Sequence, residues 1–274
     1  MKARRCILQS FVVLSFAVVA AGSLAQEKQE KKPFQPVVGQ SGKDVVWVPT
    51  PFVLIEKMLD LARVTSQDYV MDLGSGDGRN IIGAAKRGAR GKGIEWNHNM
   101  VDLAKRRAQE AGVADKAEFV QGDMYVADIS QANVMAMFLL TENLDKLMPK
   151  FLDLKPGSRI VINGFGITGW SPDVTERASG DCGSWCTAHL FYVPAKVVGT
   201  WQMPGGKLTI KQAFQKISGT LANGANSTPV EGSLKGEEIA FTAGGATYTG
   251  RVNGNSMSGD VKGGVGGKWS ATKK

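Results

Sequence analysis

The chain has 274 residues, of which 43% are hydrophobic and 21% charged, so it is long enough for one or two globular domains with a substantial core. The formal net charge of +8 falls to +5 once the first 25 residues are set aside, which leaves 30 basic and 25 acidic residues. That mild excess, with no basic stripe interleaved with aromatic residues, gives no reason to expect a nucleic-acid partner.

The first 25 residues have the pattern of a signal peptide. Basic residues open the chain, an apolar stretch follows over residues 7–22, and small residues lead up to Ala25. The apolar stretch is short for a bilayer span, so we expect cleavage after Ala25 and export to the periplasm, with an uncleaved membrane anchor as the alternative. The polar residues 26–43 are expected to form a disordered lead-in.

After this lead-in the chain alternates between strand-like and helix-like segments. Thr50 and Pro51 suit the N-cap and the first position of a helix, and apolar residues follow at helical spacing. Such alternation predicts a parallel sheet covered by helices on both faces. The strands are expected at 69–73, 92–96, 117–121, 133–139 and 159–165, and further helices at 78–88, 98–111 and 141–154.

Two cysteines follow the expected signal peptide, Cys182 and Cys186, within the stretch CGSWC. They are flanked by SPDVTERAS and TAHLFYVP, which together predict a β-hairpin. An even pair of cysteines in an oxidising compartment favours a disulfide. Three residues separate the pair, which does not match a C-x-x-C redox motif. Because His98 and His189 are the only histidines of the chain, we expect no metal site.

Beyond Gly199 the chain loses its helical periodicity. Short runs such as LTIKQAF and ATYTGRV alternate inward and outward residues, and glycine and asparagine turns separate them. We expect seven or eight strands, which suit a small up-and-down barrel or a compact sandwich, with Trp201 and Trp269 in its core. The chain is therefore expected to hold two domains, at residues 44–196 and 197–274.

The stretch DLGSGDG, at residues 72–78, follows a strand and opens a helix, the context in which a glycine motif indicates a ligand site. Glycine at 74 and 76 lets the backbone turn sharply and approach a ligand, and Gly78 allows tight packing of helix against strand. Asp72 would repel a pyrophosphate but attract the ammonium of an amino acid. The turn therefore favours a ligand with an ammonium and an uncharged linkage, with another kind of nucleotide as the alternative.

Two acidic residues end the next two strands. Glu95 follows the turn by about twenty residues, where a carboxylate can accept hydrogen bonds from two ribose hydroxyls. Trp96, beside it, offers an apolar face to an adenine ring. Asp123 ends the following strand and can accept a hydrogen bond from the exocyclic adenine amine. Together these residues predict a site for an adenosine group.

This order of glycine turn, ribose acid and adenine acid resembles the class I S-adenosylmethionine-dependent methyltransferases. The stretches WVPTP and DLGSGDGR are most similar to the branch with mitochondrial protein-lysine methyltransferases and their small bacterial relatives, over roughly residues 44–196. The resemblance implies an α/β fold with a Rossmann-like sheet, and S-adenosylmethionine as the cofactor. The export signal and the barrel-like C-terminal β domain are not part of that enzymatic core. The residues assigned to the cofactor are Thr50, Asp72, Gly74, Ser75, Gly76, Gly78, Glu95, Trp96, Asp123 and Met124.

Methyl transfer from a sulfonium requires alignment more than a reactive side chain, because the reactivity resides in the cofactor. Glu142 and Asn143 follow the strand-like run NVMAMFLL, where substrate-facing groups would lie, and they are the candidates for orienting an acceptor amine. The competing interpretation is that Thr141 caps the next helix and that Glu142 lies favourably in its first turn.

The sequence thus predicts an exported methyltransferase that acts on a protein side chain, with lysine among the candidates, or on a small molecule. The competing hypothesis is a non-catalytic protein that binds a nucleoside or S-adenosylmethionine and docks a partner through the β domain, since the cofactor is made in the cytoplasm. Export with the cofactor already bound is a third hypothesis. An association with the membrane or cell envelope is compatible with the signal-like segment, and no oligomeric state is predicted.

Overall fold

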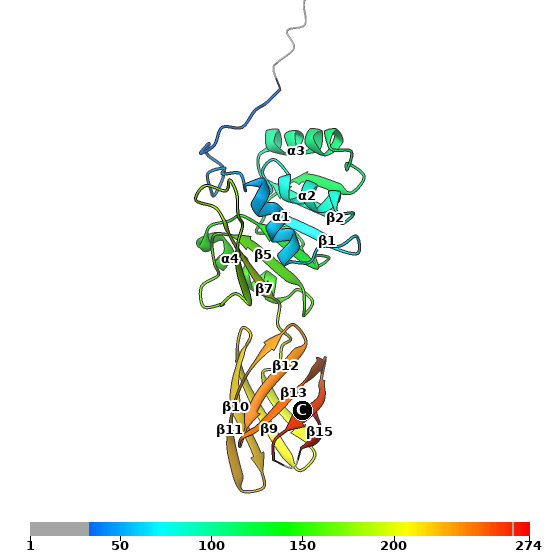
Figure 1. The fold of residues 1–274 in the computed structure, drawn as a ribbon, viewed down its shortest axis with the longest axis vertical. Helices are drawn as coiled ribbons and strands as arrows, with labels where there is room; N and C mark the ends of the chain where they lie inside the picture. Colours follow the sequence, from blue (N-terminus) through cyan, green and yellow to red (C-terminus); the bar gives the residue numbers. More distant parts are fainter. Residues whose placement is uncertain (1–32, 265) are drawn as a thin grey trace, which may run out of the picture. The chain divides into compact units, whose positions relative to one another are not determined.

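The computed structural model describes residues 33–264 and 266–274, and residues 34–274 form one compact unit (Figure 1). The expected signal peptide, residues 1–25, and the first part of the expected lead-in, residues 26–32, lie outside the described residues. Along the chain, an α/β sheet with its helices is followed by a closed β-barrel. This order confirms the predicted fold class.

The α/β part is built on a seven-stranded sheet. Its strands are β1 (Tyr69–Leu73), β2 (Arg90–Glu95), β3 (Ala117–Gln121), β4 (Val134–Met137), β5 (Arg159–Asn163), β6 (Val174–Arg177) and β7 (Thr187–Tyr192). They lie in the order β3-β2-β1-β4-β5-β7-β6. Strands β1 to β5 are parallel, whereas β7 runs antiparallel to both β5 and β6. The parallel strands require crossover connections, which explains the alternation of helix and strand in the sequence.

Successive residues of each central strand belong to two different hydrophobic cores. In β1, for example, Val70 lies in one core and Met71 in the other. Helices α1 (Phe52–Leu61), α2 (Arg79–Lys86) and α3 (His98–Glu110) contribute to the first core, and α4 (Thr141–Leu152) contributes to the second. The prediction of helices on both faces is therefore confirmed. No helix among the described residues is both long enough and apolar enough to cross a membrane.

Two helices begin one residue away from the expected cap. The carbonyl of Thr50 accepts a hydrogen bond from Arg79 at 2.8 Å, and the carbonyl of Pro51 accepts the first helical N–H groups of α1. Pro51 therefore holds the N-cap position that we expected for Thr50. In α4 the N-cap position is Leu140, so Thr141 is the first helical residue and makes no capping hydrogen bond with its side chain.

Strands β6 and β7 form the predicted hairpin, and its loop contains the predicted disulfide between Cys182 and Cys186. Inside this loop the N–H of Trp185 donates to the carbonyl of Cys182 at 2.9 Å. The loop is thus a small, internally bonded unit that carries an aromatic side chain.

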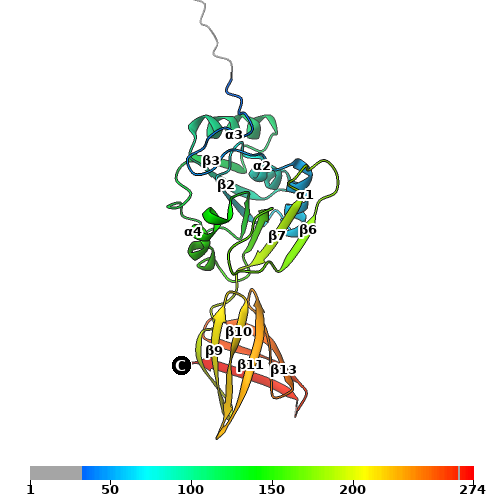
Figure 2. The same ribbon diagram turned by 90° about the vertical axis from the view of Figure 1, so that its left-hand side faces the viewer.

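The C-terminal strands close into an antiparallel barrel, which decides between the two predicted β architectures (Figure 2). Trp201, Phe241 and Trp269 lie in its core, so the expected core positions of the two tryptophans are confirmed. The indole N–H of Trp201 donates to the carbonyl of Val197 at 2.8 Å. The strands are β8 (Gly199–Met203), β9 (Gly206–Ala213), β10 (Lys216–Asn223), β11 (Asn226–Lys235), β12 (Glu238–Ala243), β13 (Ala246–Asn253), β14 (Ser256–Lys262) and β15 (Gly267–Lys273).

Candidate functional site

The glycine turn joins the end of β1 to the start of α2. Gly76 and Gly78 both have positive φ angles, 54° and 81°, which favour glycine. A Cβ atom on Gly78 would lie 2.6 Å from the ring of Phe119, so this glycine lets the turn pack tightly against β3. A Cβ atom on Gly76 would lie 2.8 Å from the indole nitrogen of Trp47. The backbone of the turn at Gly76 therefore faces the segment that precedes α1.

Glu95, at the end of β2, uses both of its carboxylate oxygens. Oε2 accepts the N–H of Gly76 and Oε1 accepts the N–H of Asn97, each at 2.9 Å. Asn97 in turn caps α3, because its side chain accepts the N–H of Asn99 at 3.0 Å. Glu95 thus ties the glycine turn to the start of α3. Each carboxylate oxygen has two lone pairs, so each retains room for one further hydrogen bond, such as one from a ribose hydroxyl.

Asp123 follows β3 and meets a lysine that the sequence analysis did not single out. Its Oδ2 lies 2.7 Å from Nζ of Lys43, and its Oδ1 accepts the N–H of Tyr125 at 2.8 Å. The hydrogen bond from Lys43, followed by that from the Tyr125 backbone, lowers the pKa of Asp123. Nζ of Lys43 also lies 4.2 Å from the ring centroid of Trp96, a residue that is half exposed. Lys43 therefore contacts both groups expected to bind an adenine.

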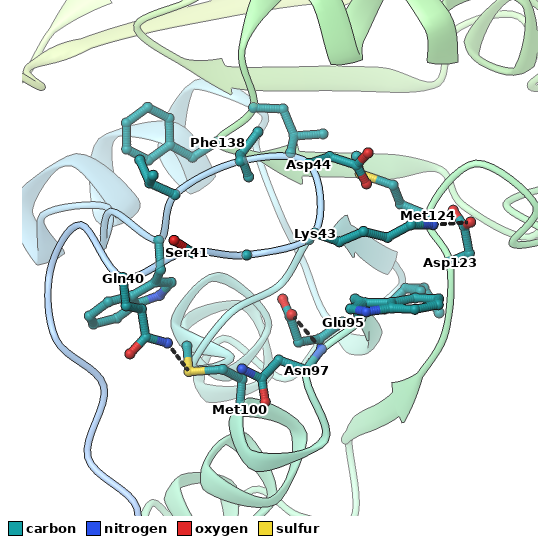
Figure 3. Close-up of a pocket in the computed structure, with 18 of the residues that line it drawn as sticks. Gln40, Ser41, Lys43, Asp44, Glu95, Asn97, Met100, Asp123, Met124 and Phe138 are labelled. Atoms are coloured by element: carbon teal, nitrogen blue, oxygen red, sulfur yellow. Dashed lines mark hydrogen bonds and ion pairs between the residues drawn. The ribbon is translucent and has the colours of Figure 1, made fainter.

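One cavity brings the nucleoside-binding candidates together (Figure 3). Residues 40–48 form one side of it, and hydrogen bonds hold them in a turn: the N–H of Gly39 donates to the carbonyl of Trp47, and the N–H of Trp47 donates to that of Gln40, each at 2.9 Å. Part of the segment expected to be a disordered lead-in is thus placed against the cavity. The expected site residues that line the cavity are Gly74, Glu95, Trp96, Asp123 and Met124.

A second hollow adjoins the first and contains the candidates for the methionine end of the cofactor. The two hollows share Trp47, Val48, Gly74 and Phe138 in their walls. Gly78 lines neither hollow and lies beneath the turn. The expected site residues that line the second hollow are Thr50, Asp72, Gly74, Ser75 and Gly76.

Asp72 is buried at the base of this second hollow. Its Oδ2 accepts a hydrogen bond from the side-chain amide of Asn80 at 3.0 Å. Burial raises the pKa of the Asp72 carboxyl well above its usual value, and the Asn80 hydrogen bond only partly opposes this. Three buried acceptors, Asp72 Oδ1, Ser75 Oγ and Asn80 Oδ1, have no hydrogen-bond partner among the described residues. Such a set of unpaired acceptors suits a ligand that carries an ammonium group.

The structure does not bring the two candidates for orienting an acceptor to either hollow. Glu142 is exposed in the first turn of α4, as the competing interpretation expected. Asn143 is buried, and its side-chain amide donates to the hydroxyl of Tyr125 at 2.7 Å. Asn143 therefore supports the segment that follows Asp123, and no acceptor-orienting geometry is seen for either residue.

Other residues of the site were missed by the sequence analysis. Lys43 and Trp47 lie in the segment that was expected to be a lead-in or merely to precede a helix. Phe138 follows β4 directly and was counted with the strand. Asn163 ends β5, is fully buried, and neither polar atom of its side chain has a partner among the described residues. A polar residue at the carboxyl end of an apolar strand is a signal that could have identified Asn163.

Comparisons with known proteins agree with this geometry. Residues 72–174, which begin at the glycine turn, match the model of the ANTKMT methyltransferase domain. A protein-lysine N-methyltransferase of Saccharolobus islandicus is 43% identical over 153 residues, which cover 54% of this chain and 94% of that protein. A mouse lysine N-methyltransferase that is named for ATP synthase is 31% identical over 156 residues, which cover 51% of this chain and 63% of the mouse protein.

A solved structure is similar as well. It is described as an RNA methyltransferase from Salinibacter ruber in complex with S-adenosyl-L-homocysteine, is 42% identical to this chain, and has a TM-score of 0.51. The similarity covers 55% of this chain and 96% of that one.

Proposed function

The chain belongs to the S-adenosylmethionine-dependent methyltransferases, in the branch with the ANTKMT methyltransferase domain, and we propose that it methylates the side-chain amine of lysine in a protein. The observation that carries the acceptor class is the 43% identity over 94% of a protein-lysine N-methyltransferase. The mouse relative is named for a lysine acceptor too. A small-molecule acceptor has no comparable support.

The residues of the two hollows fit the cofactor. We assign its ammonium to the buried acceptors around Asp72, its ribose to Glu95 and its adenine to Asp123, Trp96 and Met124. When bound, S-adenosylmethionine supplies a methyl group on a sulfonium, which passes to the lone pair of the acceptor nitrogen as the carbon–sulfur bond breaks. The unpaired buried acceptors support the assignment of the ammonium, since an ammonium would satisfy them.

The chain itself contributes binding and alignment. Glu95 fixes the glycine turn against α3, so the ribose and methionine ends of the site are held in one rigid frame. Phe138 lies in the wall common to both hollows, where it can exclude water from the point of transfer. Holding donor and acceptor in line replaces the entropy cost of their encounter, which is the main source of rate here.

The test is transfer of a labelled methyl group from S-adenosylmethionine into a cell-envelope extract by the purified mature chain. We expect label that protease releases and RNase does not, and acid hydrolysis should recover it as methylated lysine. Asp72→Ala is the matched control and should give no transfer. Label in RNA, as the name of the Salinibacter ruber protein would suggest, or in small molecules would refute the proposed acceptor.

We also propose that the chain acts outside the cytoplasm. The signal-like pattern over residues 1–25 and the Cys182–Cys186 disulfide support this, because disulfides persist in oxidising compartments. Fractionation of cells that express the chain with a C-terminal tag tests it. We expect periplasmic protein that begins at Gln26, and uncleaved protein confined to the cytoplasm would contradict it.

A further inference from the structure

Three aromatic rings from distant parts of the sequence meet beside the proposed transfer site. The ring of Phe138 lies 4.9 Å from that of Trp185 and 6.1 Å from that of Phe165, and the last two lie 5.6 Å apart, measured between centroids. All three residues are only partly buried, so their rings retain exposed surface. We call this group the aromatic wall.

Sheet topology explains why these residues meet. Phe138 follows β4 and Phe165 follows β5, at the carboxyl ends of two parallel neighbours. Strand β7 is antiparallel to β5, so Trp185, which precedes β7, arrives at the same edge of the sheet. The glycine turn lies at this edge too, at the carboxyl end of β1. The aromatic wall therefore adjoins the cofactor site as a consequence of the fold.

Trp185 is held in this position by covalent and backbone constraints. It lies within the five-residue loop closed by Cys182 and Cys186. Next to the loop, the N–H of Gly164 donates to the carbonyl of Thr187 at 2.9 Å, and a Cβ atom on Gly164 would lie 3.3 Å from the Trp185 ring. Glycine at 164 thus leaves room for the indole. The disulfide loop presents this ring to the site.

The aromatic wall differs from the other accessible aromatic residues in its lack of a cation. Lysine or arginine side chains lie over the rings of Trp96, Phe52, Tyr125 and Tyr192, at 4.2 to 5.7 Å. In the part of the chain that the structure describes, no such group lies over the three rings of the wall. Aromatic faces attract ammonium groups, and they attract methylated ammonium groups well because these are easily desolvated.

We propose that the aromatic wall receives the ammonium of the acceptor lysine and of its methylated products, and that Trp185 is a specificity-determining residue. This inference rests on the proposed lysine acceptor and assigns its recognition to named rings. Phe138 connects the wall to the cofactor site, because it also lines both hollows (Figure 3). A lysine side chain lying along the wall would reach the transfer point past this ring.

The first test measures binding without turnover. The mature chain, saturated with S-adenosylhomocysteine, is titrated with the amide of Nα-acetyl-trimethyllysine and with its neutral isostere, in which carbon replaces the quaternary nitrogen. We expect the charged probe to bind roughly threefold to thirtyfold more tightly than the isostere. Equal affinities of the wild type for the two probes would overturn the proposal.

Variants then locate the preference. Trp185→Leu removes the aromatic face but keeps an apolar side chain, and it should lose most of the preference for charge, whereas Trp185→Phe should keep much of it. Tyr192→Leu, at the opposite end of the same strand, is the matched control and should behave like the wild type. An unchanged preference in Trp185→Leu would exclude Trp185 from the site. A constant affinity for S-adenosylhomocysteine shows that each variant is folded.

A second test separates this inference from the proposed function. In the methyl-transfer assay with envelope protein, Trp185→Leu should raise KM for the acceptor and leave KM for S-adenosylmethionine unchanged. If the wild type labels no lysine at all, the proposed function fails, whatever the probes show. If the wild type labels lysine and Trp185→Leu leaves both constants unchanged, only the role of the aromatic wall fails.

Discussion

The ammonium of Lys43 lies 2.7 Å from the carboxylate of Asp123, the group that we assign to the adenine amine. The same ammonium lies over Trp96, which we assign to the adenine ring. Residues 40–48 thus cover the adenine end of the cavity and are held there by contacts that the cofactor would use. The segment must release these contacts when an adenine enters.

We therefore predict that Lys43→Ala strengthens the binding of S-adenosylhomocysteine by about twofold to fivefold, since the competing ion pair is partly exposed and weak. Calorimetry measures the affinity, and stopped-flow fluorescence should show faster association. Lys57→Ala is the control, because Lys57 pairs with Glu176 at 3.0 Å outside both hollows. Weaker binding by Lys43→Ala would mean that Lys43 contacts the ligand and does not compete with it.

The fold was largely predictable from the sequence because its signals are local. Alternating strands and helices, and the glycine-separated strands after Gly199, both follow from short-range periodicity. Helix starts were less predictable: Thr50 and Thr141 are suitable caps by residue type, yet the backbone begins each helix one residue away. A backbone acceptor can start a helix as well as a hydroxyl can, and residue type does not reveal which one is used.

The site was only partly predictable. The glycine turn and the strand-end acids have fixed places in a parallel sheet, so their positions follow from topology. The contact of Lys43 with Asp123 joins residues 80 positions apart and leaves no periodic pattern. The meeting of Trp185 with Phe138 depends on β7 running antiparallel to β5, which strand patterns alone do not indicate.

The buried Asp72 provides a prediction that relates stability to binding. Its pKa is raised by burial, so at neutral pH its ionisation costs the folded state free energy. Asp72→Asn removes that cost and should raise the Tm of the ligand-free protein. The same change should weaken the binding of S-adenosylhomocysteine by roughly tenfold to a hundredfold, because the ammonium loses a charged acceptor.

The pH dependence gives the sign of this effect. Because the folded-state pKa of Asp72 lies above its unfolded value, the stability associated with its protonated form is present in acid and is lost as the pH rises through the folded-state pKa. The gain in Tm of Asp72→Asn over the wild type should therefore be small near pH 4 and grow toward pH 8. A variant less stable than the wild type throughout this range would contradict the account.

The disulfide gives a third prediction. In exported protein purified without reductant, Cys182 and Cys186 should resist alkylation until they are reduced. The closed loop is short, so replacing both cysteines by serine should lower the free energy of unfolding by at most about 2 kcal/mol. Alkylation of both thiols in the native, non-reduced protein would show that the bridge does not form.

The most direct measurement of the central claim, that the cavity at Glu95 holds the adenosine part of the cofactor, pairs one deletion in the protein with one in the ligand. S-adenosylhomocysteine and its 2′,3′-dideoxy analogue are titrated calorimetrically into the wild type, Glu95→Ala and the control Glu118→Ala, an exposed acid paired with Lys92. We predict that the wild type and Glu118→Ala prefer the natural ribose by roughly tenfold to a hundredfold, and that Glu95→Ala binds both ligands equally. A Glu95→Ala protein that kept the full preference would place the ribose elsewhere and contradict the account.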